Sequence, residues 1–237
     1  GNQAMVELLE RHGARVTPLE GQTAFQAACM GVDRETACSL AAKHPECLND
    51  PEPMLTAARS GRSDVVALLL ELGMLVDVAD ETEQRGLHNA VAGGSLEVVK
   101  LLVAHSADVD RPTTRFGGAM GFAAHFGRRE IAAFLAPLSR DVHNMAYLGM
   151  KHRLGELFVA DPGLVNLRHF RYGFTPLFAL PEDDDRALYM AAFLLAHGAD
   201  LGTRNDEGLT AEDEFRRSGR FDVADFLHDW TPEGRLG

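Results

Sequence analysis

The stretch from Arg85 to Asp110 predicts two short helices in close succession, a unit that few folds accommodate. Residues 87–91 form the first predicted helix, and Gly93–Gly94 end it because glycine adopts the backbone angles of a tight helix terminus. Ser95 can cap the second helix. That helix, residues 96–103, is apolar on nearly every side, so it must be covered on more than one side.

The same stretch resembles the ankyrin repeat, whose pattern is a TPLHxAA inner helix, a glycine, an LEIVxxLL outer helix and a GADVN exit. The matching residues are Leu87-His88, Ala90-Val91, Gly94, Leu96-Glu97-Val98-Val99, Leu102-Val103 and Ala107-Asp108-Val109-Asp110. Arg85 and Gly86 stand in place of the family's Thr and Pro. The inner Thr–His hydrogen bond that the resemblance implies therefore lacks its threonine here.

The unit recurs along the chain. The family's inter-helix glycine falls at Gly1, Val32, Gly61, Gly94, Gly127, Gly149 and Gly219, in steps of 31, 29, 33, 33, 22 and 70 residues. The last step equals two repeats of about 35 residues, with Glu182–Asp183 at the middle position. The resemblance implies one ankyrin-repeat domain over residues 1–237: a mostly α solenoid with short β-hairpin fingers, about seven repeats and an N-terminal half repeat.

Several irregularities interrupt this pattern. The 22-residue step leaves no room for a finger at residues 138–143, so a tight loop and a local break in the row of fingers are expected there. Residues 181–185 contain a two-residue insertion between the two helices of the sixth repeat. The carboxylates of residues 182–185 suit the positive N-terminus of the next helix better than a cation site or an acid pair. A charged terminal cap repeat is expected at about residues 208–230. Gly1–Val16 predicts an outer helix without its inner partner, and hence missing residues upstream.

Composition and charge argue against several classes of protein. The net charge of −12 disfavours nonspecific binding to nucleic acid or anionic membranes. No stretch approaches the 18 or so uninterrupted apolar residues of a transmembrane helix. Cys29, Cys38 and Cys47 form no CxxC motif and cannot all pair, which suits a reducing, cytoplasmic compartment. Arginine far outnumbers lysine, and with the irregular repeat lengths this indicates a bacterial source.

Catalytic interpretations have weak support in the sequence. His88, His125 and His143 lie at or near the family's inner-helix histidine position, where repeat stacking is favoured over catalysis. No HExxH or other close metal-ligand spacing occurs, so neither a metal nor a cofactor is expected. The cysteines are interpreted as core packing, since a reactive thiol needs a basic neighbour. Gly117–Gly121 is a poor phosphate loop because no strand precedes it and no Lys-Ser/Thr follows.

The resemblance implies a ligand surface on the concave face, formed by the finger tips and the exposed edge of the inner helices. Aromatic and arginine side chains are enriched at the centres of protein interfaces. The candidate partner-binding residues are Arg59, Arg115, Phe116, His125, Phe126, Tyr147, His169, Phe170, Arg171 and Tyr172. The finger residues among them are expected to be exposed. Phe126 and Tyr147 either line the groove or fill the gap left by the missing finger.

The sequence therefore predicts a noncatalytic module that binds a protein partner, with no nucleic acid and no membrane insertion. The missing finger should open a notch beside the arginines, where a partner's acidic groups would dock while being repelled elsewhere by the acidic chain. Two alternatives stay open. The chain can be a regulatory or targeting domain of a longer enzyme or effector, or itself an enzyme with a site in the groove.

Overall fold

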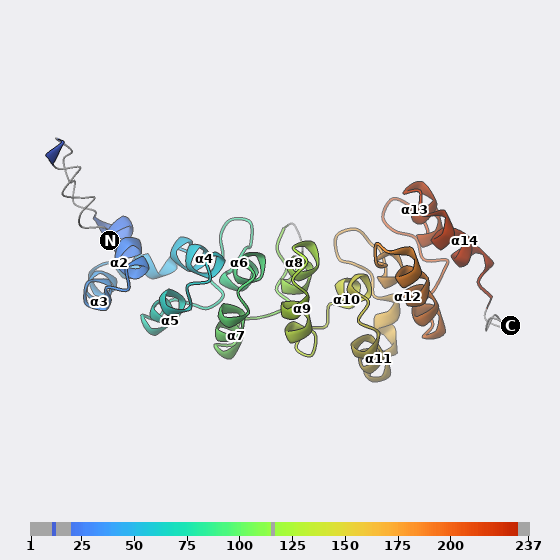
Figure 1. Ribbon diagram of the computed structural model, residues 1–237, viewed down its shortest axis with the longest axis horizontal. Coiled ribbons are helices and arrows are strands. Elements are labelled where there is room, and N and C mark those ends of the chain that lie inside the picture. Colours follow the sequence, from blue (N-terminus) through green and yellow to red (C-terminus); the bar gives the residue numbers. More distant parts are fainter. Residues whose placement is uncertain (1–10, 13–19, 115–116, 232–237) are drawn as a thin grey trace. The chain divides into compact units, whose positions relative to one another are not determined.

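The computed structural model describes residues 11–12, 20–114 and 117–231 of the chain. It divides into two compact units, Gly1–Ala119 and Met120–Gly237, each a series of short helices (Figure 1). The described residues are mostly helical, with two isolated antiparallel β-bridges and no longer strand. The mostly α fold expected from the sequence is therefore confirmed, whereas a single domain over residues 1–237 stays a prediction.

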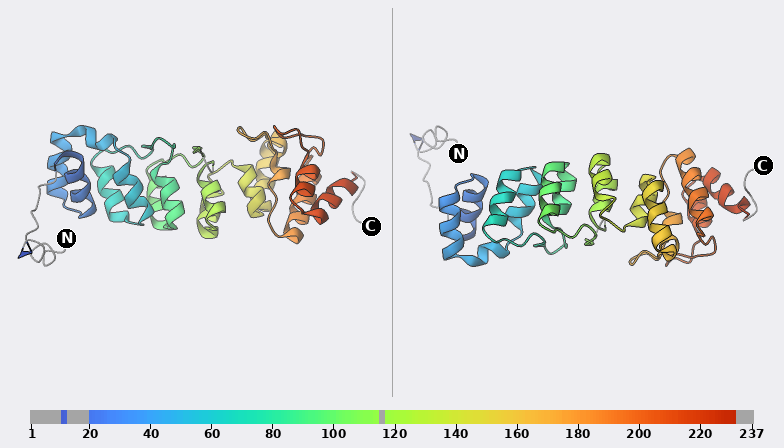
Figure 2. Two further views of the ribbon diagram at one scale, coloured as in Figure 1. Left: turned by 90° about the horizontal axis from the view of Figure 1, so that it is seen from above. Right: turned by 90° about the horizontal axis from the view of Figure 1, so that it is seen from below.

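Helix pairs build the N-terminal unit. The pairs are α2 (Gly21–Met30) with α3 (Arg34–Lys43), α4 (Glu52–Arg59) with α5 (Ser63–Glu71), and α6 (Gly86–Gly93) with α7 (Leu96–Ala104), with a 3-10 helix, η1 (Pro45–Asn49), after α3. Successive pairs pack through their first helices, α2 against α4 and α4 against α6. The connections that follow α3 and α5 lie along one edge of the pairs (Figure 2). Each pair thus buries its apolar face against its neighbours, as in a solenoid.

The α6–α7 pair confirms the helix termini predicted from the sequence. Gly94 ends α6 in the left-handed region with a φ of 84°. The hydroxyl of Ser95 accepts a hydrogen bond from the N–H of Val98 at 3.3 Å, which caps α7. Leu87 and Leu102 are 1% and 0% exposed. Burial of each such leucine contributes about 1.5–3 kcal/mol, so tertiary packing rather than helix propensity holds these short helices.

A residue with positive φ marks the turn inside most helix pairs. The predicted glycine positions that the structure describes have these φ values: Val32 57°, Gly61 70°, Gly94 84°, Gly127 65°, Gly149 79° and Gly219 81°. The repeat spacing seen in the sequence therefore corresponds to one recurring backbone conformation. Val32 adopts it despite its β-branched side chain, for which the left-handed region is strained.

A close approach of α6 to the end of α4 requires a glycine at position 93. A Cβ atom placed on Gly93 would lie 2.2 Å from the carbonyl oxygen of Arg59. Ala57, Ala58 and Ala90 are fully buried on the same two helices. Small residues on both helices therefore let the two backbones approach closely.

The connections between pairs contain hairpin-like turns in the N-terminal unit. Ala79 and Arg85 form an antiparallel bridge, and the N–H of Asp80 donates to the carbonyl of Gln84 at 3.0 Å. A second bridge joins Thr113 to Gly117. These are single bridges rather than named strands, so the expected β-hairpin fingers are present only as turns in the described residues.

The C-terminal unit continues the series of short helices. Its elements are α8 (Ala119–His125, whose first residue closes the other unit), α9 (Arg129–Leu135), α10 (Val142–Leu148), α11 (Lys151–Ala160), η2 (Pro162–Asn166), η3 (Pro176–Phe178), α12 (Asp184–Ala196), α13 (Ala211–Arg217) and α14 (Phe221–Asp229). Leu154, Leu177 and Leu194 are fully buried in its core. α14 packs on both α13 and α12.

The step from α9 to α10 contains no hairpin. The N–H groups of Leu138 and Ser139 both donate to the carbonyl of Leu135, at 2.9 and 3.0 Å. Asp141 then caps α10 by accepting a hydrogen bond from the N–H of Asn144 at 3.0 Å. No β-bridge occurs in this segment, all of which the structure describes. The tight loop predicted from the 22-residue step is therefore confirmed.

The sixth repeat differs from its prediction. Its expected inner helix is only the three-residue 3-10 helix η3, which follows Thr175. Pro181 gives the reason, since a proline ring clashes with the carbonyl four residues earlier and disfavours helix at the residue before it. Asp183 caps α12 by accepting from the N–H of Arg186 at 2.9 Å, and Asp184 and Asp185 lie in its first turn. The acidic run is therefore at the helix N-terminus, as predicted.

An N-terminal half repeat and a C-terminal cap repeat were predicted for the two ends of the solenoid. The predicted half repeat Gly1–Val16 lies outside the described residues apart from residues 11–12. At the other end, α13 carries the expected charges, namely Glu212, Asp213, Glu214, Arg216 and Arg217. Its role as a terminal cap stays a prediction.

Candidate binding surface

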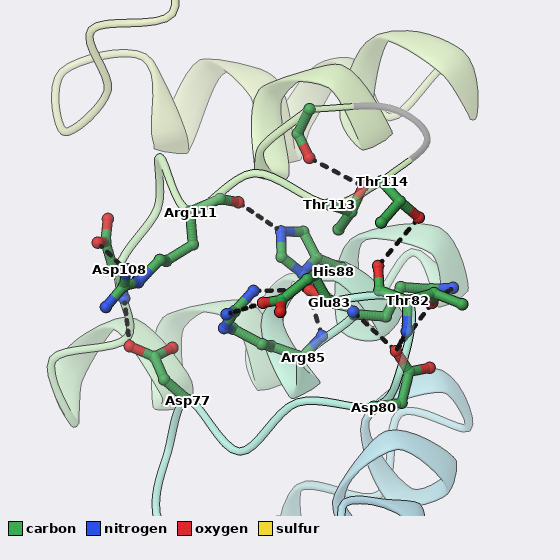
Figure 3. Close-up of polar contacts among 12 residues, drawn as sticks. Asp77, Asp80, Thr82, Glu83, Arg85, His88, Asp108, Arg111, Thr113 and Thr114 are labelled. Carbon is green, nitrogen blue, oxygen red and sulfur yellow. Dashed lines mark hydrogen bonds and ion pairs between the residues drawn. The ribbon is translucent and has the colours of Figure 1, made fainter. Parts of the chain in front are cut away.

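His88 is buried at the centre of a polar cluster in the N-terminal unit (Figure 3). Its Nδ1 accepts a hydrogen bond from the backbone N–H of Arg85 at 3.1 Å. Its Nε2 lies 3.0 Å from the carbonyl oxygen of Arg111. Because Nδ1 is the acceptor, the proton resides on Nε2, which donates to that carbonyl. Burial disfavours the charged ring and lowers the pKa of His88 to about 4.

The residues around His88 bond mainly to one another (Figure 3). Arg85 donates to the carbonyl of Glu83 at 2.6 Å and to its carboxylate at 2.7 Å. Asp80 Oδ1 accepts from the N–H of Thr82 at 2.8 Å, which closes the turn. The hydroxyl of Thr114 donates to the carbonyl of Thr82 at 3.2 Å, joining this connection to the next one. These contacts hold the connections in place and explain His88 without any catalytic role.

His143 repeats this arrangement in the C-terminal unit. Its Nε2 lies 2.9 Å from the carbonyl oxygen of Leu167, and Nε2 of His88 contacts the carbonyl oxygen of Arg111 in the same way. In both cases the carbonyl belongs to the connection that follows the outer helix of the pair. Burial lowers the pKa of His143 as well. The predicted stacking role of both histidines is thus supported by their contacts. His125 differs, because its side chain is exposed on α8.

Four aromatic side chains form a layered cluster on the connection before η3, residues 167–174, hereafter the aromatic finger. Their ring-centroid distances are 4.8 Å for His169–Phe170, 5.4 Å for His169–Tyr172, 4.6 Å for His169–Phe174 and 6.1 Å for Tyr172–Phe174. The His143 ring meets the edge of this stack, 5.4 Å from both His169 and Phe174. Offset stacks of this kind stiffen a loop that has no strand to hold it.

The tip of the aromatic finger is open to solvent. Phe170 and Tyr172 are 68% and 51% exposed, and Arg171 is exposed as well. The guanidinium of Arg171 lies 5.9 Å from the centre of the Phe170 ring. His169 is half-buried, and burial lowers its pKa. The predicted exposure is therefore confirmed for Phe170, Arg171 and Tyr172 but not for His169, whose ring packs inside the stack.

A groove of about 380 Å³ runs beside the aromatic finger and is hereafter the finger groove. Apolar side chains on one side come from Tyr172, Phe174 and Phe178. The other side is formed by residues 205–207 and by α13. The N–H of Asp206 donates to the carbonyl of Tyr172 at 3.0 Å, so the two connections that border the groove are bonded directly.

Charged residues dominate the second side of the finger groove. Arg217 on α13 forms ion pairs with Glu207 at 2.6 Å and Glu214 at 2.7 Å. Arg168, which is not a lining residue of the groove, forms an ion pair with Asp206 at 3.3 Å. The finger groove therefore joins an apolar surface to a charged one, an arrangement that suits a protein segment with a mixed side-chain pattern.

The remaining predicted residues lie apart from this finger. Arg59 is exposed at the end of α4 in the N-terminal unit. Arg115 and Phe116 lie outside the described residues. Phe126 is half-buried, with its ring centre 6.1 Å from that of Phe122 and 4.8 Å from that of His125. For Phe126 the packing alternative therefore accounts for the contacts.

Tyr147 lines a separate cavity of about 580 Å³ in the C-terminal unit. Its hydroxyl donates a hydrogen bond to Glu182 at 2.7 Å. Burial and the neighbouring Glu182 carboxylate raise the pKa of Tyr147. Gly127 and Arg186 line the same cavity, which places it at the turns between inner and outer helices rather than at the finger tips.

Several lining residues of the finger groove were not predicted from the sequence: Phe174, Phe178, Asp206, Glu207, Glu214 and Arg217. Arg217 had one available signal, because it lies on the exposed edge of the last predicted inner helix. The phenylalanines had none, since a Phe beside Thr175-Pro176 is as compatible with core packing as with exposure.

The cysteine prediction is correct for two of the three residues. Cys29 and Cys47 are buried, and burial raises the pKa of Cys29 to about 11, so its thiol is unreactive. Cys38 is exposed, which makes its assignment to the core wrong. The buried stripe of α3 runs through Ala37 and Ala41, and a residue one position beyond Ala37 points away from it.

No group of three or more His, Cys, Asp or Glu side chains within residues 11–12, 20–114 and 117–231 is placed to hold a metal ion. In the same residues, no helix has the length and apolar character needed to cross a bilayer.

Comparison with known protein families identifies the repeats in part of this chain. Residues 54–146 match the family model of ankyrin repeats, in 3 copies. This part of the chain therefore consists of ankyrin repeats, and the resemblance seen in the sequence is confirmed.

Two of three curated relatives carry the ankyrin repeat in their names. The ankyrin repeat and KH domain-containing protein mask-1 of Caenorhabditis elegans is 25% identical over 98% of this chain and 9% of its own length. The ankyrin repeat and SAM domain-containing protein 6 of Danio rerio is 32% identical over 57% of this chain and 18% of its own length. Zygote-specific protein 3 of Chlamydomonas reinhardtii is 46% identical over 24% of this chain and 15% of its own length. The chain thus spans less than a fifth of each relative.

One solved structure shares the fold over most of the chain. It is a chain of the complex between the Bd0816 predatory endopeptidase from Bdellovibrio bacteriovorus and immunity protein Bd3460. The TM-score is 0.56 at 24% sequence identity, over 75% of this chain and 97% of that chain. At this identity the likeness supports the fold alone.

Proposed function

We propose that this chain is a noncatalytic module that binds a protein partner through the aromatic finger and the finger groove. The observation that carries the proposal is the pair of exposed rings, Phe170 at 68% and Tyr172 at 51%, on a finger that is rigid at its base. Rigid aromatic side chains bury a large area at little entropic cost, so they are the side chains that most often anchor interfaces.

The chemistry of the described residues supports binding rather than catalysis. The Nε2 atoms of the buried histidines, His88 and His143, are both hydrogen-bonded to a backbone carbonyl. The finger groove holds three carboxylates, and Glu207 and Glu214 are bonded to Arg217. These carboxylates are thus bonded to guanidinium groups of the same chain, which suits charged recognition of a protein segment.

A quantitative pull-down tests the proposal. Wild-type chain, Phe170→Ala and Arg171→Ala are used as bait in extracts of the native cell. Both variants should weaken partner binding by roughly 1–3 kcal/mol, the range of interface hot spots. Phe221→Ala is the matched control, because Phe221 is 57% exposed on the outer helix α14. Equal capture by all four baits would move the binding surface away from the finger.

A second candidate function is that of a regulatory or targeting domain within a longer enzyme or effector. The observation in its favour is that the curated relatives are much longer than the matched region, which is 9 to 18% of their length. The complete reading frame decides between the two, because a catalytic motif outside residues 1–237 would assign the chemistry to another domain.

Finer features of the architecture and setting are also proposals. Each helix pair, with η3 and α12 counted as one, would be a repeat, which gives seven repeats over the described residues. Hairpin-like fingers would follow most of them, as around Ala79 and Thr113. A bacterial source and a cytoplasmic location rest on composition alone, and immunodetection after cell fractionation tests the location.

A further inference from the structure

The finger groove has two chemically different sides. On one side the rings of Phe174 and Phe178 lie with their centres 6.4 Å apart and offer an apolar surface. On the other side lie Asp206, Glu207 and Glu214. A ligand that fills the groove must therefore satisfy an apolar surface and carboxylates at once.

The arginines near the carboxylates do not neutralise this side. Arg217 is shared between Glu207 and Glu214, so one cation faces two carboxylates. Arg168 is engaged by Asp206 and by the carbonyl of Arg204, at 3.3 and 2.7 Å. Both cations are thus committed to partners inside the chain, and the triad of Arg217 with two glutamates retains one negative charge.

Two of the carboxylates remain accessible to a ligand. The side chains of Glu207 and Asp206 are 65% and 60% exposed, whereas that of Glu214 is 30% exposed. A carboxylate that already accepts from one guanidinium has lone pairs left for a second donor. A cationic group of a ligand can therefore bond to these two residues without displacing Arg217.

The charge of the whole chain acts in the same direction. The sequence carries a net charge of −12, so its long-range field attracts cationic partners and repels anionic ones. The sequence alone suggested acidic partner groups docking on the arginines. The finger arginines on which that choice rested are Arg115, which lies outside the described residues, and Arg171, which lines the groove. A cationic partner group is favoured instead, because three carboxylates line the groove against two guanidiniums, those of Arg171 and Arg217.

We propose that the finger groove takes a segment of another protein in which an aromatic or large aliphatic side chain lies close to a lysine or arginine. The apolar side chain would pack on Phe174 and Phe178, and the cation would pair with Asp206 and Glu207. This rests on the proposed protein-binding function and names the kind of partner that it requires.

Selection from a random peptide display library tests the inference directly. Purified wild-type chain is the bait, and Phe170→Ala is used to subtract peptides that do not depend on the finger. The expected result is enrichment of sequences with an aromatic or aliphatic residue next to Lys or Arg. Their affinity should fall as salt is raised, because the ion pairs are exposed and screened.

The double variant Asp206→Asn, Glu207→Gln then locates the cationic contact. It should weaken the selected peptides by about twofold to tenfold, since each exposed ion pair is worth up to about 1 kcal/mol. Glu81→Gln is the matched control, because Glu81 is an exposed carboxylate on a connection of the other unit. Unchanged melting curves confirm that both variants are folded.

The possible failures are distinguishable. Enrichment of acidic or uncharged peptides, or no loss in the double variant, overturns the partner chemistry and leaves protein binding intact. Failure to enrich any finger-dependent peptide counts against the proposed function itself. Self-association of the chain that Phe170→Ala abolishes, measured by light scattering, would identify a second copy as the occupant and also overturn the inference.

Discussion

The backbone N–H of Arg85 donates a hydrogen bond to Nδ1 of His88 over 3.1 Å. The donor is the main chain, so the contact survives where the family's threonine is replaced by arginine. At Thr175 the replacement is the reverse one, and its buried hydroxyl has no hydrogen-bond partner among the described residues. There the threonine is kept, but Phe178 occupies the position of the family's histidine.

Stability should depend on pH through His88. Its folded pKa of about 4 lies below the usual value of 6.5, so between these values the unfolded chain binds more protons than the folded one. The free energy of unfolding therefore rises with pH in this window, and up to roughly 3 kcal/mol present above pH 6.5 is lost as pH falls towards 4. Urea titrations across this range measure the slope.

The variant His88→Asn isolates this contribution, because an amide does not titrate. Its unfolding free energy should be lower than wild type at pH 7 by about 1–3 kcal/mol, owing to the lost bonds to Arg85 and Arg111. The pH slope should flatten by the amount assigned to His88. An unaltered slope in the variant would show that other groups cause it.

Val32 should be a site of stabilisation. Its φ of 57° is strained for a β-branched residue, whereas glycine adopts it freely. Val32→Gly should raise the free energy of unfolding by about 0.5–1 kcal/mol, the relief of strain minus the backbone entropy of glycine. Gly94→Ala, at the same position of another pair, should lower it by about 1 kcal/mol. Two changes of the same sign in thermal melts would contradict this account.

Gly93→Ala should destabilise the N-terminal unit. The added methyl would lie 2.2 Å from the carbonyl oxygen of Arg59, and backbone atoms cannot rotate away. Separating α4 from α6 costs about 1–3 kcal/mol, as other overpacked cores do. Gly163→Ala is the control, since its nearest contact is a side-chain oxygen at 3.4 Å. Chemical denaturation that ranks the two variants equally would rule out the close approach as the cause.

Phe170→Ala and Arg171→Ala should leave stability nearly unchanged. Both side chains are exposed, so their removal leaves no cavity in the core. Phe170 loses its stacking contact with His169, so the free energy of unfolding should change by about 1 kcal/mol or less. Leu177→Ala, at a fully buried leucine two residues from the groove-lining Ala179, should instead cost about 2–5 kcal/mol. Melting temperatures check the contrast. A large drop for Phe170→Ala would assign the finger to the core.

The sequence alone was sufficient for the features that depend on near neighbours along the chain. Glycine spacing located the left-handed turns at Gly61 and Gly94, and Ser95 caps the helix that it was predicted to cap. Asp183 lies at the helix N-terminus that was predicted for the acidic run. The short step also predicted the missing hairpin before α10. These outcomes follow because backbone angles and caps are decided by residues within one helical turn.

Only the tertiary structure decided which side chains face one another across repeats. Arg168 meets Asp206 and Arg217 meets Glu207, and neither pairing has a local signal in the sequence. Cys38 points away from the core, although the repeat pattern suggested otherwise. The physical reason is that burial and ion pairing depend on the packing of neighbouring repeats. That packing places residues far apart in sequence within contact distance, so the charge and shape of the finger groove emerge only once the chain is folded.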